Sequence, residues 1–295
     1  MATNALQVGD VTITALVDLE IDRFPWGLDQ IFPAAKTRDL EPFQQRYPEV
    51  FNGPNGWRVD VSAYLLQSQG HTILVDTGGG PASTAFTNWV GGDGQLPAQL
   101  QATGVDPSDI ESVLLTHLHW DHVGWTVRPG DGDPQLMFPR AKYLVHQDDW
   151  DTFQRPDVQA AAPFPFVDEL VTPIETLGAL QLFTGDHTVT EAITMLHTPG
   201  HTPGSMSILV ASAGEKALIW GDAIVHPALV TEPNWEFGFD MDKPQAARTR
   251  EAILSRVEDE GMTAVSCHMP APGYGNIIRL EGRRWWSASD SEENS

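Results

Sequence analysis

The sequence is poor in cysteine and in basic side chains. A single cysteine, Cys267, excludes a disulfide within the chain and therefore a secreted scaffold that depends on disulfides. Lys and Arg number 17 against 40 Asp and Glu, which gives a formal net charge of −23 over 295 residues. Because a field of this sign repels phosphate backbones and anionic lipid headgroups, we expect neither nucleic acid nor a membrane as a partner.

Long apolar runs are also missing. No stretch reaches the ~20 apolar residues of a membrane helix, and residues 1–4 do not begin a basic segment followed by an apolar one. We therefore expect a cytoplasmic protein, or a periplasmic one if a signal peptide has been removed. The 41% of hydrophobic residues can fill one large core. We expect a single domain over residues 1–286 and a disordered tail of small polar residues at 287–295.

Apolar periodicity indicates a mixture of strands and helices. We expect strands at 11–17, 63–66, 72–75, 113–115, 141–145, 205–210, 216–220 and 263–266, and helices at 96–102, 147–153 and 243–257. Residues 23–58 break this pattern with five prolines among many aromatic side chains, so helices there should start and stop quickly. We interpret this insertion either as an irregular cap over the core or as a pocket wall or dimer contact.

Metal-ligating side chains are densest directly after the apolar run 113–115, where His117, His119, Asp121 and His122 follow one another. If the run is a strand, its period of two points His117 and His119 to the same side as the chain leaves the sheet. A single zinc ion takes three or four protein ligands, so four here and others elsewhere indicate two adjacent metal ions. The alternative is a polar loop whose histidines are packed or solvated.

The HxHxDH pattern of residues 117–122 resembles the signature of the metallo-β-lactamase fold superfamily, which also has a later His, a bridging Asp and a final His at strand ends. This sequence has His201, Asp222 and His268 in that order. The resemblance implies an α/β fold, namely an αββα four-layer sandwich of two mixed sheets flanked by helices. It also implies that His117, His119 and His201 hold one metal ion, that Asp121, His122 and His268 hold the other, and that Asp222 bridges.

The implied cofactor is a pair of divalent metal ions. Imidazole and carboxylate suit zinc best, and also manganese, iron or cobalt, and we expect no cysteine thiolate at the site. Two adjacent ions can share and activate a water as hydroxide, which attacks a carbonyl or phosphoryl group while the ions stabilise the developing charge. Asp121 and Asp222 would serve catalysis through these ions.

Later segments resemble the branch of quorum-quenching lactonases and methyl parathion hydrolase. Residues 268–275 look like a His-x-Pro-x-Pro-Gly-x-Gly segment of that branch, and His226 follows Asp222 by four positions. Val225 stands where short lactonases carry a Tyr that holds the lactone oxygen. The resemblance implies a homodimer and a small apolar substrate, either a lactone or an aryl ester, with phosphotriester cleavage as a side activity.

Supporting roles are open to two interpretations each. By resemblance, Asp76 braces the metal loop by hydrogen bonding without ligating, or it is an ordinary turn residue. His226 is a proton shuttle or a packed histidine, whereas we assign His71, His146, His187 and His197 no metal. Aromatic side chains either line the pocket or pack in the core. Those concerned are Trp26, Trp57, Trp150, Phe153, Phe164 and Phe166.

Other functions on the same fold also have to be considered. A glyoxalase II-like thioesterase and a mononuclear iron sulfur dioxygenase are the alternative enzymes, and a non-catalytic metal-binding protein is the alternative outside enzymes. The dioxygenase would not need every ligand of a second metal, and a degenerate protein would be expected to have lost a ligand. We therefore expect a metal-dependent hydrolase.

Overall fold

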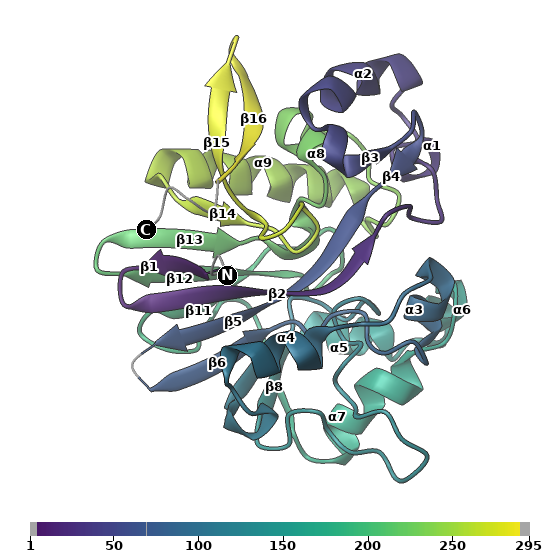
Figure 1. Ribbon diagram of the computed structural model, residues 1–295, viewed down its shortest axis with the longest axis vertical. Coiled ribbons are helices and arrows are strands. Elements are labelled where there is room, and N and C mark those ends of the chain that lie inside the picture. Colours follow the sequence, from purple (N-terminus) through teal and green to yellow (C-terminus); the bar gives the residue numbers. More distant parts are fainter. Residues whose placement is uncertain (1–4, 69, 290–295) are drawn as a thin grey trace.

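Two seven-stranded mixed sheets face each other in the computed structural model, which describes residues 5–68 and 70–289 (Figure 1). The first sheet has the order β1 (Ala5–Val8), β2 (Val11–Ile21), β5 (Val59–Ser68), β6 (His71–Val75), β7 (Ser112–Leu114), β8 (Lys142–His146) and β9 (Leu180–Phe183). The second has the order β10 (His187–Thr188), β11 (Ile193–His197), β12 (Met206–Ser212), β13 (Glu215–Ile219), β14 (Thr263–Val265), β15 (Tyr274–Leu280) and β16 (Arg283–Ala288).

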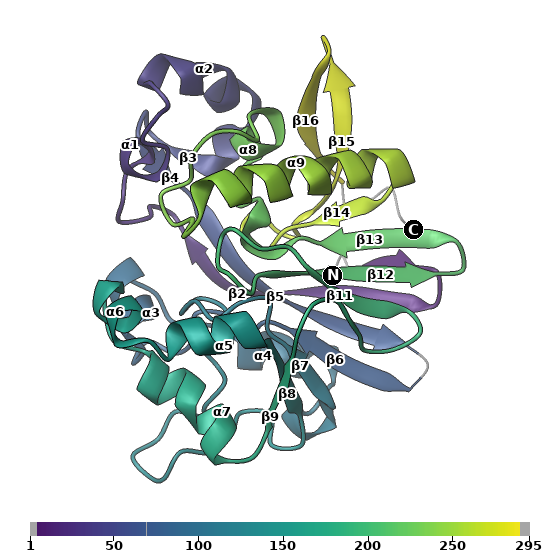
Figure 2. The same ribbon diagram turned by 180° about the vertical axis from the view of Figure 1, so that it is seen from behind.

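Helices cover the outer face of each sheet. On the first sheet these are α4 (Leu96–Thr103), α5 (Gln147–Phe153) and α7 (Thr172–Thr176), whereas α3 (Ala85–Val90) and α6 (Pro156–Ala161) lie side by side at one end of the molecule (Figure 1). On the second they are α8 (Pro227–Thr231) and α9 (Lys243–Glu260). Figure 2 shows α9 lying along the second sheet while α5 and α7 lie against the first. The expected αββα sandwich is confirmed.

The strands are apolar on both faces because each sheet packs on the other sheet with one face and on helices with the other. On β5, Leu66 packs between the sheets with Ile13 and Ile208, whereas its neighbour Leu65 packs under the helices with Val113. Side chains that alternate along one strand thus contribute to two hydrophobic cores, one on each face of the sheet. Each fully buried side chain of this size stabilises the fold by about 1.5–3 kcal/mol, so the strand ends that carry the functional residues rest on a rigid base.

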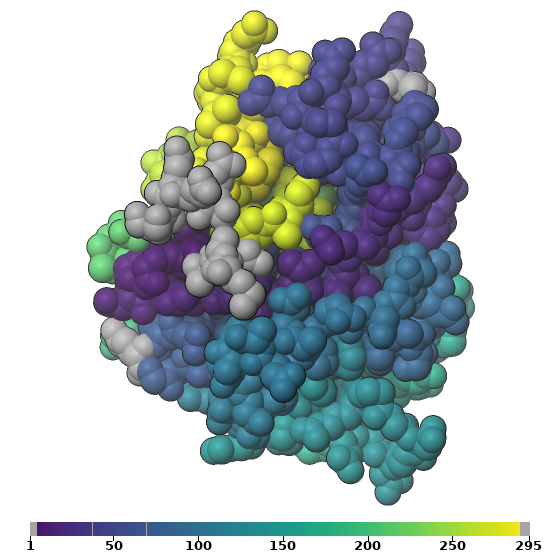
Figure 3. Space-filling model, in the orientation of Figure 1, coloured from purple at the N-terminus to yellow at the C-terminus, as the bar shows by residue number. Residues whose placement is uncertain are grey.

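The insertion at 23–58 folds as short pieces, as its prolines predict. It contains α1 (Leu28–Ile31), α2 (Thr37–Arg46), β3 (Phe51–Asn52) and β4 (Gly56–Trp57). It packs on the C-terminal hairpin β15–β16, where the Tyr47 hydroxyl donates to the Trp286 carbonyl over 2.8 Å and Phe43 contacts Trp285. The space-filling view shows the two segments side by side at one end of the molecule (Figure 3).

The disordered tail that we predicted at 287–295 begins too early in the sequence, because its first residues belong to a strand. Strand β16 continues to Ala288, and Ser287 pairs with Asn276 across the hairpin, because backbone pairing and the packing of Trp286 hold these small residues in the sheet. The rest of the predicted tail, 290–295, lies outside the described residues, as do residues 1–4. Among the described residues, none of the helices is both long and apolar enough to cross a membrane.

Candidate metal centre

The metal-binding segment leaves the first sheet at the end of β7. Its position is fixed by Asp76, which follows the neighbouring parallel strand β6 with a φ of 59°. Asp76 accepts hydrogen bonds from the Thr116 amide over 2.7 Å and from the Thr116 hydroxyl over 2.8 Å. It also accepts from His122 Nδ1 over 2.8 Å. This last contact leaves His122 Nε2 facing the site, buried and without a hydrogen-bond partner.

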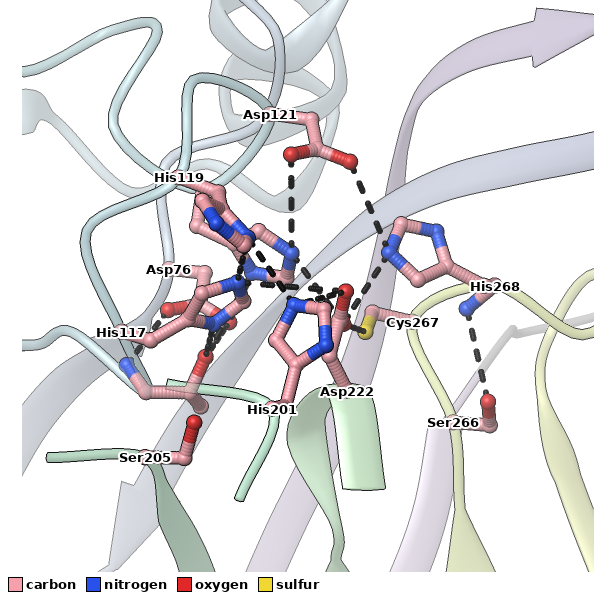
Figure 4. Close-up of polar contacts among 12 residues, drawn as sticks. Asp76, His117, His119, Asp121, His201, Ser205, Asp222, Ser266, Cys267 and His268 are labelled. Carbon is pink, nitrogen blue, oxygen red and sulfur yellow. Dashed lines mark hydrogen bonds and ion pairs between the residues drawn. The ribbon is translucent and has the colours of Figure 1, made fainter. Parts of the chain in front are cut away.

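One group of ligand atoms converges around His119 (Figure 4). Its Nδ1 lies 2.9 Å from His117 Nε2 and 2.9 Å from His201 Nε2. Asp222 Oδ2 lies 3.4 Å from the same His201 nitrogen. All four residues are buried. Three imidazole nitrogens and a carboxylate oxygen in this space match the donor set and the size of a site for one divalent ion.

A second group lies on the other side of Asp222. Asp222 Oδ1 lies 3.2 Å from His122 Nε2 and 3.1 Å from His268 Nε2. Asp121, which is partly exposed, approaches the same nitrogens, with 3.6 Å between its Oδ2 and His268 Nε2. Because the two oxygens of Asp222 face different groups, its carboxylate has the geometry of a bridge between two cations.

The histidines of the two groups differ in the direction of their pKa shifts. Burial lowers the pKa of His117 and of His119 well below the ordinary value, so these imidazoles are neutral and ready to ligate. Burial acts the same way on His122 and His268, but the Asp222 carboxylate outweighs it and raises the pKa of both. These histidines in turn hold the pKa of Asp222 well below its usual range against the effect of burial. The negative charge of Asp222 between the two groups favours the binding of a pair of cations.

His201 and His268, like His122, are oriented from behind, and sequence reasoning missed their partners. The Asp60 carbonyl accepts from His268 Nδ1 over 2.8 Å, and Asp240 Oδ1 lies 3.2 Å from His201 Nδ1. Asp149, at the start of α5, joins two ligand loops: it accepts from the Leu118 amide over 3.0 Å and from the Gly204 amide over 2.6 Å. Such contacts fix the ring orientation and raise ligand basicity.

A narrow cavity of about 30 Å³ opens above the candidate ligands. Its floor consists of His119, Asp121, His201, Asp222 and His268. Its walls are aromatic and aliphatic side chains from the insertion, from β2, β5 and α3, from the metal loop and from the residues that follow β13. They are Ile21, Phe24, Trp57, Val59, Val61, Phe86, Trp120, Val225, Phe237 and Phe239. No Lys or Arg is among these lining residues, so the cavity presents ligand atoms to an apolar space.

Residues 56–268 match the profile of the Metallo-beta-lactamase superfamily. The chain belongs to this superfamily. An N-acyl homoserine lactonase from a Bacillus species is 28% identical over 211 residues, which cover 67% of this chain and 74% of that enzyme. The resemblance on which the ligand assignment depends is therefore confirmed at the level of the superfamily and its lactonase relatives.

Two solved superfamily structures match almost the whole chain. The hydrolase AbOPH superposes with a TM-score of 0.80 at 24% identity, covering 97% of each chain. AidC, a dizinc quorum-quenching lactonase in complex with a product, superposes with a TM-score of 0.78 at 22% identity, also covering 97% of each chain. At these identities the likeness establishes the shared fold alone.

The cavity lining distinguishes the two interpretations of the aromatic side chains. Trp57 lines the cavity, whereas Trp26, Trp150, Phe153, Phe164 and Phe166 are absent from its lining. They form a layer behind it: Trp26 stacks on Phe239 at 4.7 Å between ring centroids, and Phe164 packs on Trp120 at 5.2 Å. The reason is that α5 and the segment after α6 cover the outside of the first sheet, so their aromatics support the lining residues.

His226 does not reach the reaction site, contrary to the shuttle interpretation. It is fully buried, its Nδ1 accepts from the Ala228 amide at the start of α8, and its ring contacts Phe32, Phe51 and Trp57. Burial lowers its pKa to about 3, so it stays neutral. The structure gives it a capping and packing role.

Cys267 lies closer to the site than we expected. Its Sγ donates to Asp222 Oδ1 over 3.4 Å and lies within the second ligand group, as a protonated thiol and not as the thiolate that we did not expect at the site. Burial raises the pKa of this thiol to about 12. The sequence held one signal for this, since Cys267 directly precedes His268, but neighbours along a strand end usually point to opposite sides.

A further group of His146, Asp148 and His197 has the composition of a metal site but not its geometry. The two imidazoles stack at 4.2 Å with 12° between their planes, so their nitrogens do not converge on one point in the ring planes. His146 Nε2 accepts from the Gly185 amide over 2.9 Å and His197 Nε2 faces the Pro203 carbonyl. Packing accounts for this group.

Proposed function

We propose that this chain is a dinuclear metal-dependent hydrolase that cleaves an ester-like bond in a small, uncharged, apolar molecule. The substrate is a lactone or an aryl ester, with phosphotriester cleavage as a side activity. One observation carries the proposal: two groups of ligand atoms share Asp222 at the floor of an apolar cavity. The lactonase relative supports the choice of reaction.

In this proposal His117, His119 and His201 hold one ion, and His122 and His268 hold the other together with Asp121. Asp222 serves both ions. When bound, the two ions supply Lewis acidity and an activated water. Zinc is the favoured metal because the donors are imidazoles and carboxylates and because AidC is a dizinc lactonase.

The chain's own residues position the substrate and exclude water. Trp57, Phe237 and Phe239 offer flat apolar walls to an acyl chain or an aryl leaving group. Their apolar surface keeps the cavity dry, which strengthens the electrostatic interactions at its floor. Val225 offers no hydroxyl to the lactone oxygen, so polarisation of the substrate falls to the ions rather than to a tyrosine.

The lining also weighs against the alternative enzymes. A thioesterase or sulfur dioxygenase that recognises a charged thiol conjugate would need a cationic side chain near its substrate. The described residues that line this cavity include no Lys or Arg. The complete second group of ligands is likewise more than a mononuclear iron site needs.

The test is turnover by zinc-loaded protein of a panel containing N-acyl homoserine lactones, p-nitrophenyl esters and paraoxon. We expect the highest kcat/KM on neutral lactones or esters, a much lower value on paraoxon, and none after removal of the metal by a chelator. The proposal would be rejected if the protein kept nearly all of its activity after chelation. It would also be rejected if the protein hydrolysed no carbonyl ester.

A further inference from the structure

The segment between α8 and α9, residues 232–242, connects the cavity wall to a metal ligand. It carries Phe237 and Phe239, which line the cavity. The Phe237 ring also stacks on the His201 ring at 6.0 Å, with 29° between the planes. We call residues 232–242 the wall loop. A loop without regular structure would be expected to move, so the contacts that hold it decide how well the cavity is defined.

Three contacts tie the wall loop to the loop that presents His201. Asp240 Oδ1 lies 3.2 Å from His201 Nδ1. The Met241 amide donates to the His201 carbonyl over 3.0 Å, and the Asp242 amide donates to the Gly200 carbonyl over 2.9 Å. The position of the ligand ring and the position of the wall loop are therefore set together.

Arg250 completes this connection from the rigid helix α9. Its guanidinium is fully buried and donates to Asp240 Oδ2 over 2.9 Å. It also donates to the Pro233 and Trp235 carbonyls over 2.8 and 3.0 Å, near the start of the wall loop, and to the Ala223 carbonyl over 2.9 Å, next to the bridging Asp222. One planar side chain thus holds both ends of the wall loop and the segment that carries the bridge.

The buried ion pair between Asp240 and Arg250 is not explained by stability alone. Desolvation of two charges commonly cancels their attraction, so such a pair adds little stability compared with apolar side chains of similar size. Its value lies in geometry, because the arginine fork fixes several acceptors at once. Here the acceptors belong to the cavity wall and to the surroundings of the metal ligands.

We propose that Asp240 and Arg250 are positioning residues that couple the first metal site to the cavity wall, so that metal binding at His201 orders the wall loop. Asp240 links the His201 ring to Arg250, and Arg250 holds both ends of the loop, so a His201 ring fixed by ligation would also fix the loop. The proposal rests on the proposed metal site but not on the proposed reaction.

Hydrogen exchange of the backbone amides tests the coupling without turnover. In the wild type, we expect peptides covering residues 232–242 to exchange more slowly when zinc is bound than after chelator treatment. In Asp240→Asn, which keeps the side-chain size but turns an amide group toward the guanidinium or the imidazole, this zinc-dependent protection should be lost. The zinc affinity of the His117–His119–His201 site, measured by competition with a chromophoric chelator, should fall ~10–100-fold.

Two further variants separate positioning from general stability. Arg250→Lys keeps the charge but not the fork, so it should also lose the zinc-dependent protection of the wall loop. Arg256→Met removes an exposed ion pair with Glu260 on the same helix and should retain both the protection and the affinity. If Arg250→Lys does not fold, Asp240→Asn decides alone. Unchanged zinc-dependent protection in Asp240→Asn, or no such protection in the wild type, would overturn the inference.

Discussion

At the scale of single residues, Asp222 is the side chain on which the site depends. Each of its oxygens faces a different group of histidines, at 3.1–3.4 Å from the nearest nitrogens. Burial alone would favour its neutral form, and the surrounding imidazoles reverse this. A neutral side chain of the same shape would therefore lose the charge that both proposed ions share.

We predict that Asp222→Asn lowers kcat/KM by about a thousand-fold or more, because several kcal/mol of charge stabilisation disappear at ~1.4 kcal/mol per factor of ten. Metal analysis should find fewer than two zinc ions per chain. Asp259→Asn is the control, since Asp259 is exposed on α9. Two bound ions and wild-type turnover in Asp222→Asn would contradict the bridging role.

The pKa shifts of the ligands predict different pH dependence for the two metal ions. The pKa of His117 and of His119 is lowered, so neither of these two rings has to lose a proton when the first ion binds. The pKa of His122 and of His268 is raised, so the second ion must displace protons at neutral pH. As pH falls from 8 to 6, the second ion should be lost first.

Calorimetric titration of zinc in buffers with different ionisation enthalpies counts the released protons and checks this order. We expect larger proton release for the weaker of the two binding events. Equal proton release in both events, or loss of both ions together as pH falls, would show that the two groups do not differ in this way.

Sequence reasoning selected the residues that form the two groups of candidate ligands, but not the residues behind them. His117 to His122 lie within six positions and the later ligands occur in a known order, so the pattern is readable along the chain. Asp149 and Asp240 contact loops that lie 31 and 39 positions away in the sequence. Nothing in their local sequence marks such contacts, because they arise only when two strand ends meet.

At the scale of elements, β2 holds the glycine-rich loop that follows β6. Asp18 on β2 is buried and accepts from the amides of Gly79 and Gly80, from the amide of Leu96 at the start of α4, and from the indole of Trp125. A single carboxylate thus joins a strand, a loop, a helix and the segment after the metal ligands. Burial raises its pKa, while these four donors oppose that shift.

We predict that Asp18→Ala lowers the free energy of unfolding by about 4 kcal/mol, because several buried donors lose their acceptor at ~1–3 kcal/mol each. Urea unfolding of both proteins measures the difference. Asp22→Ala, four positions along, removes an exposed pair with Arg58 and should cost less than about 1 kcal/mol. Similar losses in the two variants would show that Asp18 has no special role.

The insertion contributes two wall residues, Phe24 and Trp57, to the cavity. The buried Trp57 indole contacts Phe24 and Phe237, which also line the cavity. The prolines and aromatics of residues 23–58 predicted short elements correctly. They could not identify Trp57 as a residue facing the site, because Trp26 has the same local character and lies one layer behind.

We predict that Trp57→Ala raises KM for esters with long acyl chains about 10-fold, with a smaller effect on acetyl esters, since the lost contact is apolar burial worth ~1–3 kcal/mol. Steady-state kinetics on a chain-length series measures the ratio of the two effects, which a loss of stability alone would not change. Leu280→Ala alters an exposed residue of the β15–β16 hairpin and serves as the control. Equal effects on all chain lengths would remove Trp57 from the substrate contacts.

At the scale of the whole molecule, a net charge of −23 surrounds a cavity whose described lining residues include no Lys or Arg. Such a field does not attract anionic substrates, and it repels a carboxylate product once an ester has been cleaved. Charge thus agrees with an uncharged substrate and an acidic product.

Single strands and the longest helices could be predicted because they carry clear apolar periods, whereas the sandwich as a whole was implied by the resemblance to the superfamily. Helix α5 begins and ends at the predicted residues, and β2 extends four residues beyond the predicted end. Short elements such as β10 and α8 were missed, since two to five residues carry no readable period. The hairpin β15–β16 was missed in part because its polar exposed face resembles a tail.

Stepwise addition of zinc to chelator-treated protein, with hydrolysis of a neutral lactone followed at each step, tests the central claim most directly. The account predicts that activity rises until two zinc ions are bound per chain and then stays constant. Full activity with one ion bound, or no turnover of the lactone with two, would contradict it.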